Sequence, residues 1–83
     1  MSKLKEMRTE RGLSQSQLAK KAGVSYRAYQ CYEQGTASFD RVHMDTMLKI
    51  CLALECKMED VLTDSELLDL LRQYREMVNK MAS

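Results

Sequence analysis

The sequence has no proline, and it has only three glycines and one histidine in 83 residues. Few turn formers, together with abundant Leu, Lys, Glu, Gln and Met, predict an all-α fold with little room for sheet turns. No stretch approaches the roughly 18 uninterrupted apolar residues of a membrane span, and the start of the chain is too charged for a secretory signal. We therefore expect a cytoplasmic protein that does not enter a membrane.

The sequence also lacks the residue groups that catalysis and metal binding require. It contains no paired base and nucleophile, no glycine-rich phosphate loop and no cluster of metal ligands around His43. We therefore expect no enzyme activity, no metal and no cofactor. The cysteines are odd in number, and a cytoplasmic location would keep them reduced. Cys51 and Cys56 are interpreted as small core residues.

Two short helices are predicted close together between residues 12 and 35. Ser14 and Gln17 have the spacing of a capping box, which predicts a helix over residues 15–22. Ser25 is a suitable N-cap for a second helix over residues 26–34, and a glycine follows each helix where a left-handed stop is needed. The connection between them is short enough to force a steep crossing, so the pattern predicts a helix-turn-helix.

The second of these helices has two different faces. At about 100° per residue, one side carries Ala28, Tyr29, Tyr32 and Glu33. The other side is mostly polar, and its Arg27 and Gln30 are residue types that bind base edges in a major groove. An amphipathic helix whose polar face only meets water would have the same pattern, so this helix alone leaves both interpretations open.

Short sequence motifs follow one another in a characteristic order along most of the chain. They are Leu4 to Arg8, Gly12 to Gln15, Leu18-Ala19, Gly23 to Ser25, Tyr32 to Gly35, and Met47 to Ile50 through Leu54 to Leu62. This series resembles the phage-repressor and Cro-like (XRE-type) helix-turn-helix family of transcriptional regulators. The resemblance implies a lambda-repressor-like DNA-binding domain of about five short helices in residues 1–63, followed by a C-terminal amphipathic helix in residues 64–83.

The resemblance also assigns roles to individual residues. It implies base-facing positions at Tyr26, Arg27, Gln30 and Cys31 in the second, recognition helix, and backbone contacts from Gln15, Gln34 and Arg41. It further implies a structural ion pair between Arg8 and Glu33, whose inward-facing carboxylate needs a partner. An acid–base role for that pair is the weaker alternative, because nothing around it resembles a nucleophile. Cys31 is either an inert surface thiol, a DNA contact or a redox sensor.

The net charge of +1 conceals an asymmetry along the chain. Residues 1–42 carry eight basic and four acidic side chains, whereas residues 43–83 carry five basic and eight acidic ones. The positive half contains the helix-turn-helix, where phosphates would have to be met, although such an asymmetry also arises by chance in soluble proteins. We therefore expect a sequence-specific regulator that binds double-stranded DNA.

Three further segments complete the predicted domain. Residues 36–43 are expected to be irregular, with Phe39 and Val42 as core anchors. Residues 44–54 are apolar over most of their circumference and predict a central core helix containing Met44, Met47, Leu48, Ile50, Cys51, Leu52 and Leu54. Glu55 stands where the family usually has glycine, which implies a different cap or a strained residue. A short helix near residues 58–62 closes the core.

The C-terminal segment begins with a second possible capping box, Thr63 and Glu66. Apolar residues then repeat at helical spacing: Leu67, Leu70, Leu71, Tyr74, Met77, Val78 and Met81. This helix either folds back onto its own domain or forms the interface of a homodimer on a palindromic operator. A further alternative is an antitoxin or bridging module that uses the same fold to bind a protein partner.

Overall fold

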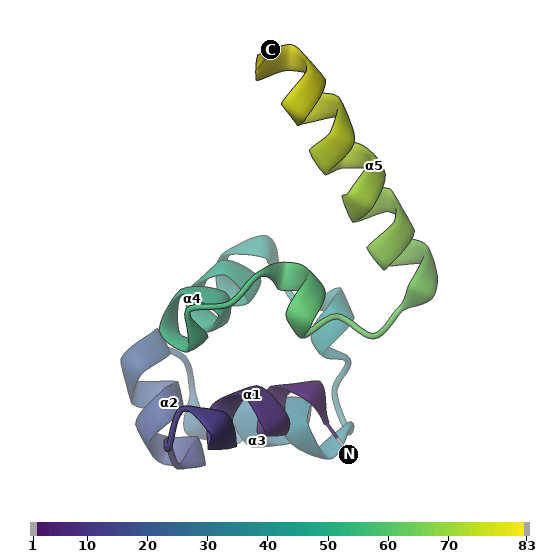
Figure 1. Cartoon of the computed structure of the whole chain (residues 1–83). Coiled ribbons are helices and arrows are strands. Elements are labelled where there is room, and N and C mark those ends of the chain that lie inside the picture. The colour runs from purple at the N-terminus through teal and green to yellow at the C-terminus, as the bar shows by residue number, and fades with distance from the viewer. Residues whose placement is uncertain (1, 83) are drawn as a thin grey trace.

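The computed structural model describes residues 2–82, and that range contains helices but no strands. The helices are α1 (Lys3–Glu10), α2 (Gln15–Ala22), α3 (Tyr26–Gln34), α4 (Met44–Leu54) and α5 (Ser65–Ala82), with 3-10 helices η1 (Phe39–Arg41) and η2 (Met58–Asp60). Helices α1 to α4 pack together, whereas α5 projects away from them (Figure 1). The predicted all-α fold is therefore confirmed. Residues 1 and 83, the outer ends of the two predicted segments, lie outside the described range.

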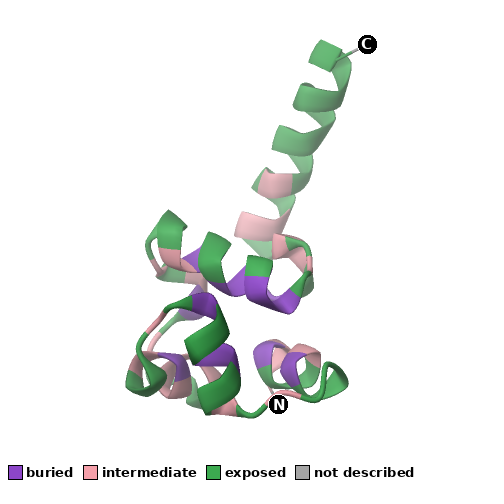
Figure 2. Cartoon of the chain, turned by 90° about the vertical axis from the view of Figure 1, so that its left-hand side faces the viewer, coloured by how far each residue is buried: buried purple, intermediate pink, exposed green. Residues whose placement is uncertain are grey.

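The hydrophobic core lies between α1, α2, α3 and α4. Its largest fully buried side chains are Leu18 of α2, Tyr29 of α3, and Ile50 and Leu54 of α4. Helix α2 packs against both α3 and α4, and its small Ala19 and Ala22 are buried there. Figure 2 shows the buried residues gathered on the inner sides of these helices, while most of α5 is exposed. The core therefore holds α2 and α3 in a fixed crossing.

Local signals in the sequence set the ends of α2 and α3. The hydroxyl of Ser14 accepts a hydrogen bond from the Gln17 backbone N–H at 3.1 Å, and the Gln17 side chain accepts one from the Ser14 N–H at 2.8 Å. Gly23 and Gly35 end the two helices in left-handed conformations, with φ of 73° and 82°. Side chains at these positions would be strained, and glycine avoids that cost.

The segment after α3 is more regular than expected. It contains η1, in which Phe39 is buried and packs edge-on against Tyr32 of α3, with the ring centroids 5.7 Å apart. Val42 is partly buried against the same core. The prediction of a wholly irregular stretch was wrong, because the aromatic contact anchors a helical turn directly behind α3.

Helix α4 is less buried than its composition suggests. Met44, Leu48 and Leu52 are 64, 45 and 76% exposed, although all three were expected in the core. They are spaced four residues apart and so share one stripe of the helix. Met47, Ile50, Cys51 and Leu54 on the opposite side are buried, as expected. The prediction was wrong for the outer stripe, because composition does not show which side of an apolar helix faces the core.

Glu55 ends α4 in a left-handed conformation with φ of 54°, and it is the one non-glycine residue in the described range with a positive φ. This position is therefore strained, one of the two possibilities that the sequence left open. Arg11, which directly follows α1, supplies an additional cap, since its guanidinium Nε donates a hydrogen bond to the Leu54 carbonyl. Cys51 is buried, while Cys56 is only partly buried.

The start of α5 is capped by Asp64 and not by Thr63. One carboxylate oxygen of Asp64 accepts hydrogen bonds from the backbone N–H groups of Glu66 and Leu67, at 2.9 and 3.1 Å. Thr63 instead donates its N–H to the carboxylate of Asp40 at 3.0 Å, and the Asp64 N–H donates to the same oxygen at 2.6 Å. The predicted Thr63–Glu66 capping box was wrong, because Asp40 binds Thr63 and leaves the capping role to the next residue.

Candidate nucleic-acid interface

The outer face of α3 carries the four residues predicted to face bases. Tyr26 and Arg27 are exposed, and Gln30 and Cys31 are partly exposed. Tyr29, on the opposite side, is completely buried in the core. The helix is nine residues long, and its diameter with side chains, about 10–12 Å, fits a major groove about 12 Å wide. The arrangement therefore presents a short, mostly polar helix face on a rigid support.

A hydrogen-bond network joins this face to the start of α2. The Gln30 side-chain amide donates to the Tyr26 hydroxyl at 3.0 Å and to the side-chain oxygen Oε1 of Gln15 at 3.4 Å. Gln15 in turn donates its own amide to a carboxylate oxygen of Glu33 at 3.0 Å. We did not predict these contacts from the sequence, although the four-residue spacing of Tyr26 and Gln30 is a signal for one of them. The network restricts the side chains that would meet the bases.

A buried ion pair lies at the inner end of the network. Arg8 Nε is 2.6 Å from one Glu33 carboxylate oxygen, and a second guanidinium nitrogen is 3.1 Å from the other. The side chains are 9 and 3% exposed. Arg8 also donates to the Leu13 carbonyl at 2.7 Å. The pair therefore fastens α1 to α3 with two parallel hydrogen bonds, the strongest geometry available to these groups.

The surroundings of this pair favour its charged form. Burial opposes ionisation of Glu33, but the hydrogen bonds from Arg8 and Gln15 outweigh it and lower the pKa of the carboxyl group. The hydrogen bond to Glu33 likewise raises the pKa of Arg8 against the effect of burial. Burial and the adjacent Glu33 raise the pKa of Tyr29, so its hydroxyl stays protonated. These charges serve to hold the helices together.

The three residues predicted to contact the DNA backbone lie on three different elements of the structure. Gln15 lies beside Gln30 and Glu33, with both ends of its side-chain amide engaged. Gln34 is exposed at the end of α3. Arg41, in η1, is directed toward the start of α5, with its guanidinium 3.5 Å from the Asp64 carboxylate. Of the three, Gln15 contacts Gln30, one of the predicted base-facing residues, whereas Arg41 pairs with Asp64 at the start of α5.

Some basic side chains in the first half of the chain are bonded within the domain, and others are exposed at the surface. Arg8 and Arg11 are directed toward Glu33 and the Leu54 carbonyl, as described above, and Lys3 donates to the Leu62 carbonyl at 2.6 Å. Lys20 of α2 and Arg27 of α3 have exposed side chains. These two residues place positive charge on the two helices that form the candidate interface.

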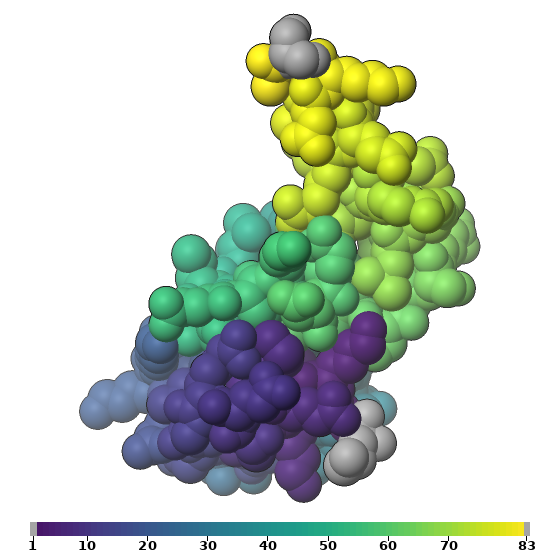
Figure 3. Space-filling view, viewed as in Figure 1, coloured from purple at the N-terminus to yellow at the C-terminus, as the bar shows by residue number. Residues whose placement is uncertain are grey.

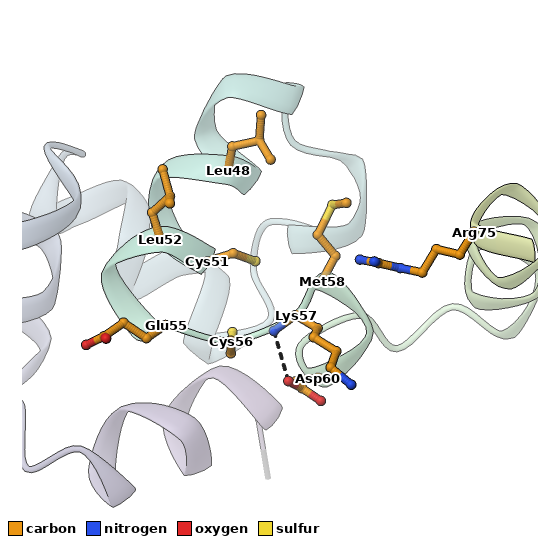
Figure 4. Close-up of a pocket in the computed structure, with 9 residues that line it drawn as sticks. All are labelled: Leu48, Cys51, Leu52, Glu55, Cys56, Lys57, Met58, Asp60 and Arg75. Atoms are coloured by element: carbon orange, nitrogen blue, oxygen red, sulfur yellow. Dashed lines mark hydrogen bonds between the residues drawn. The ribbon is translucent and has the colours of Figure 1, made fainter. Parts of the chain in front are cut away.

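Among residues 2–82, no group of three His, Cys, Asp or Glu side chains is close enough to hold a metal ion. Within the same residues, no helix has the length and apolar character to cross a membrane. A cavity of about 550 Å³ lies between α4, η2 and α5, lined by Leu48, Cys51 and Met58 among others (Figure 4). It is built from elements other than α2 and α3.

Comparison with known proteins agrees with this geometry. A model of the Cro/C1-type helix-turn-helix DNA-binding domain matches residues 3–66, which include the whole candidate interface. A chain of the solved SinR protein/SinI protein complex is similar, with a TM-score of 0.65 and 25% identity over 95% of this chain and 90% of that chain. No curated protein sequence matches. The protein is a DNA-binding regulator, and the chain belongs to the Cro/C1-type helix-turn-helix family.

Proposed function

We propose that the protein recognises a specific operator in double-stranded DNA by placing α3 in the major groove, and that it acts as a repressor in the cytoplasm. The observation that carries this proposal is the exposed Arg27 next to Gln30, on a helix whose other side is locked into the core. A guanidinium binds the two acceptors of guanine with two hydrogen bonds, and a glutamine amide pairs in the same way with adenine.

The network around Gln30 supports this role. Its amide already has partners in Tyr26 and Gln15, so its position is restricted before DNA arrives. Restricting a side chain in advance lowers the entropy lost on binding. Gln15 at the start of α2 is close enough to share a phosphate contact with the amide groups of that helix end. We propose that the protein acts by binding alone, without an enzymatic step.

We further propose that the active form is a homodimer on a palindromic operator. Helix α3 reaches only a few base pairs, and two copies related by a two-fold axis would read two half-sites about one helical turn apart. The apolar side chains along α5 support dimerisation, because five of them are large and exposed: Leu70, Tyr74, Met77, Val78 and Met81.

Replacement of Arg27 tests the recognition step. The Arg27→Ala variant should lose about 1–3 kcal/mol of binding to its selected operator and relax specificity at one base pair, because the guanine contact is removed. Lys5→Ala, which removes an exposed cation from α1, is the matched control and should keep the ratio of operator to random-duplex affinity. Both affinities are measured by fluorescence anisotropy at one salt concentration. An unchanged ratio for Arg27→Ala would contradict the assignment.

A second candidate function is binding of a protein partner, as an antitoxin or bridging protein. The similar chain was solved in a complex of the SinR and SinI proteins, and exposed apolar residues on α5 are suited to a helical partner. Co-expression with the product of the adjacent gene, followed by size-exclusion chromatography, tests this. A stable complex that loses DNA binding would favour regulation by a partner.

A further inference from the structure

Large exposed apolar side chains are concentrated on two helices. Among the described residues, nine such side chains are exposed, and Tyr26 of the recognition helix is the one that lies outside α4 and α5. The others are Met44, Leu48 and Leu52 on α4, and Leu70, Tyr74, Met77, Val78 and Met81 on α5. An apolar patch of this kind on a small domain marks an interaction surface.

The two exposed stripes border one groove. Met58 of η2 lies between them and lines three adjoining cavities, of about 550, 230 and 170 Å³. Leu48 and Leu52 border the first cavity from α4, and Tyr74 and Val78 border the second from α5. Figure 4 shows Leu48 and Met58 on one side and Arg75 reaching across from α5. We call this surface the α4–α5 groove.

The groove is held open by contacts at the base of α5. Arg75 Nε is 2.8 Å from a carboxylate oxygen of Glu59, next to Met58 in η2. Asp40 binds the backbone at Thr63 and Asp64, and Leu67 and Leu71 pack against the core. These contacts fix the first turns of α5, and the later turns rise above α4 without covering it (Figure 3). The chain itself therefore leaves the groove unfilled.

The charge pattern of α5 indicates what fills the groove. Acidic residues lie at its start, where Asp64, Glu66 and Asp69 occur before any basic residue. From residue 72 onward it carries Arg72, Arg75 and Lys80 against the single acid Glu76. Arg72 and Arg75 also pair with Asp69 and Glu59 of the same chain. Two such helices side by side attract each other when antiparallel, since each acidic end then meets a basic end, and repel when parallel. A second copy of α5 is therefore complementary in charge to the first.

We propose that the α4–α5 groove receives α5 of a second copy of this chain in antiparallel orientation, so that Met44, Leu48 and Leu52 form half of the dimer interface. Each protomer inserts its α5 between α4 and α5 of the other, which is the reciprocal arrangement that a two-fold axis requires. The inference deepens the proposed homodimer and adds α4, which sequence analysis had placed wholly in the core.

Substitution on α4 tests the proposal without changing α5. Leu48→Glu places a charge in the groove on a side chain that is already 45% exposed, so the fold should be retained, as circular dichroism and thermal melting would check. We expect the dimer dissociation constant, from sedimentation equilibrium, to rise at least about tenfold. Ser16→Glu adds the same charge on the exposed surface of α2, away from the groove, and is the control. An unchanged dissociation constant for Leu48→Glu, or a monomeric native chain, would overturn the proposal.

Cross-linking tests the orientation. Leu70→Cys and Met81→Cys chains, substituted at two exposed positions of α5, are mixed and oxidised, and the linked peptides are identified by mass spectrometry. Antiparallel helices should link position 70 of one chain to position 81 of the other, whereas links of 70 to 70 and 81 to 81 would contradict the proposal. The DNA-binding proposal is tested separately. Leu48→Glu should still prefer a single operator half-site over random DNA, and this preference should depend on Arg27. A native dimer without any sequence preference would contradict recognition by α3 and leave the dimer proposal intact.

Discussion

Glu33 links the packed interior of the molecule to the face that we propose contacts DNA. Its carboxylate accepts hydrogen bonds from Arg8 on one side and from Gln15 on the other. Gln15 then contacts Gln30 on the exposed face. A buried carboxylate contributes to stability only while it is charged and fully paired. The same residue therefore affects both the stability of the domain and the position of its base-facing side chains.

Arg8→Ala should destabilise the domain strongly. The substitution leaves the Glu33 carboxylate buried without its cation, which typically costs about 3–5 kcal/mol. Urea denaturation at pH 7 measures the free energy of unfolding. Arg8→Ala combined with Glu33→Ala should recover part of the loss, because no charge is then left unpaired. Equal stabilities for Arg8→Ala and the native protein would show that the pair contributes nothing.

Acid should weaken the domain through Glu33. Because the pKa of this carboxyl is lowered below its ordinary value of 4.5 in the folded state, the unfolded chain takes up the proton first. The stabilising contribution is thus present above about pH 4.5 and disappears as the pH falls through the lower, folded value. Urea denaturation between pH 7 and 3 should show a steeper decline for the native protein than for Glu33→Gln. Parallel curves would contradict the role of this residue.

Residue roles were predictable where one local pattern was sufficient. The inward position of Glu33 called for a cation, and family resemblance pointed to Arg8; the two side chains do lie together. Gln15 was interpreted as a backbone contact alone, because its contacts with Glu33 and Gln30 depend on how α2 crosses α3. The crossing geometry is a tertiary property and leaves no periodic signal in the sequence. The four base-facing assignments remain predictions.

Helix ends differ in how closely the sequence determines them. The capping box at Ser14 and the glycines after α2 and α3 gave the bounds found in the structure, since these signals act within one turn. The start of α5 was missed because Asp40, more than twenty residues away, engages Thr63. The exposed stripe on α4 was missed for a related reason: burial depends on which neighbours are present, and α5 leaves that stripe uncovered.

Glu55→Gly should stabilise the protein. Glu55 holds a left-handed conformation, which costs a residue with a side chain roughly 1 kcal/mol and glycine very little. Its ion pair with Lys21 is long, at 3.7 Å, and exposed, so its loss matters little. We expect a gain of about 0.5–1 kcal/mol in urea denaturation. Glu55→Ala removes the same ion pair but keeps the strain, so a gain for this control would contradict the explanation.

In the proposed dimer, the domain and its C-terminal helix together would let a chain of 83 residues recognise an extended DNA site. A domain this small buries only about 60–65% of its unfolded surface, so pairing adds stability as well as a second recognition helix. Asp40 follows α3 closely and binds the start of α5. Dimerisation through α5 would therefore set the spacing of the two recognition helices through one short connection.

Selection of bound duplexes from a random pool, carried out at two salt concentrations, tests whether α3 recognises a specific DNA sequence. Phosphate contacts weaken steeply with salt, whereas base contacts determine which sequences are retained. Our account predicts one motif, enriched at both concentrations and made of two inverted half-sites about 10 base pairs apart from centre to centre. Binding that falls with salt and enriches no common motif would show attraction to phosphates alone, and it would contradict sequence recognition by α3.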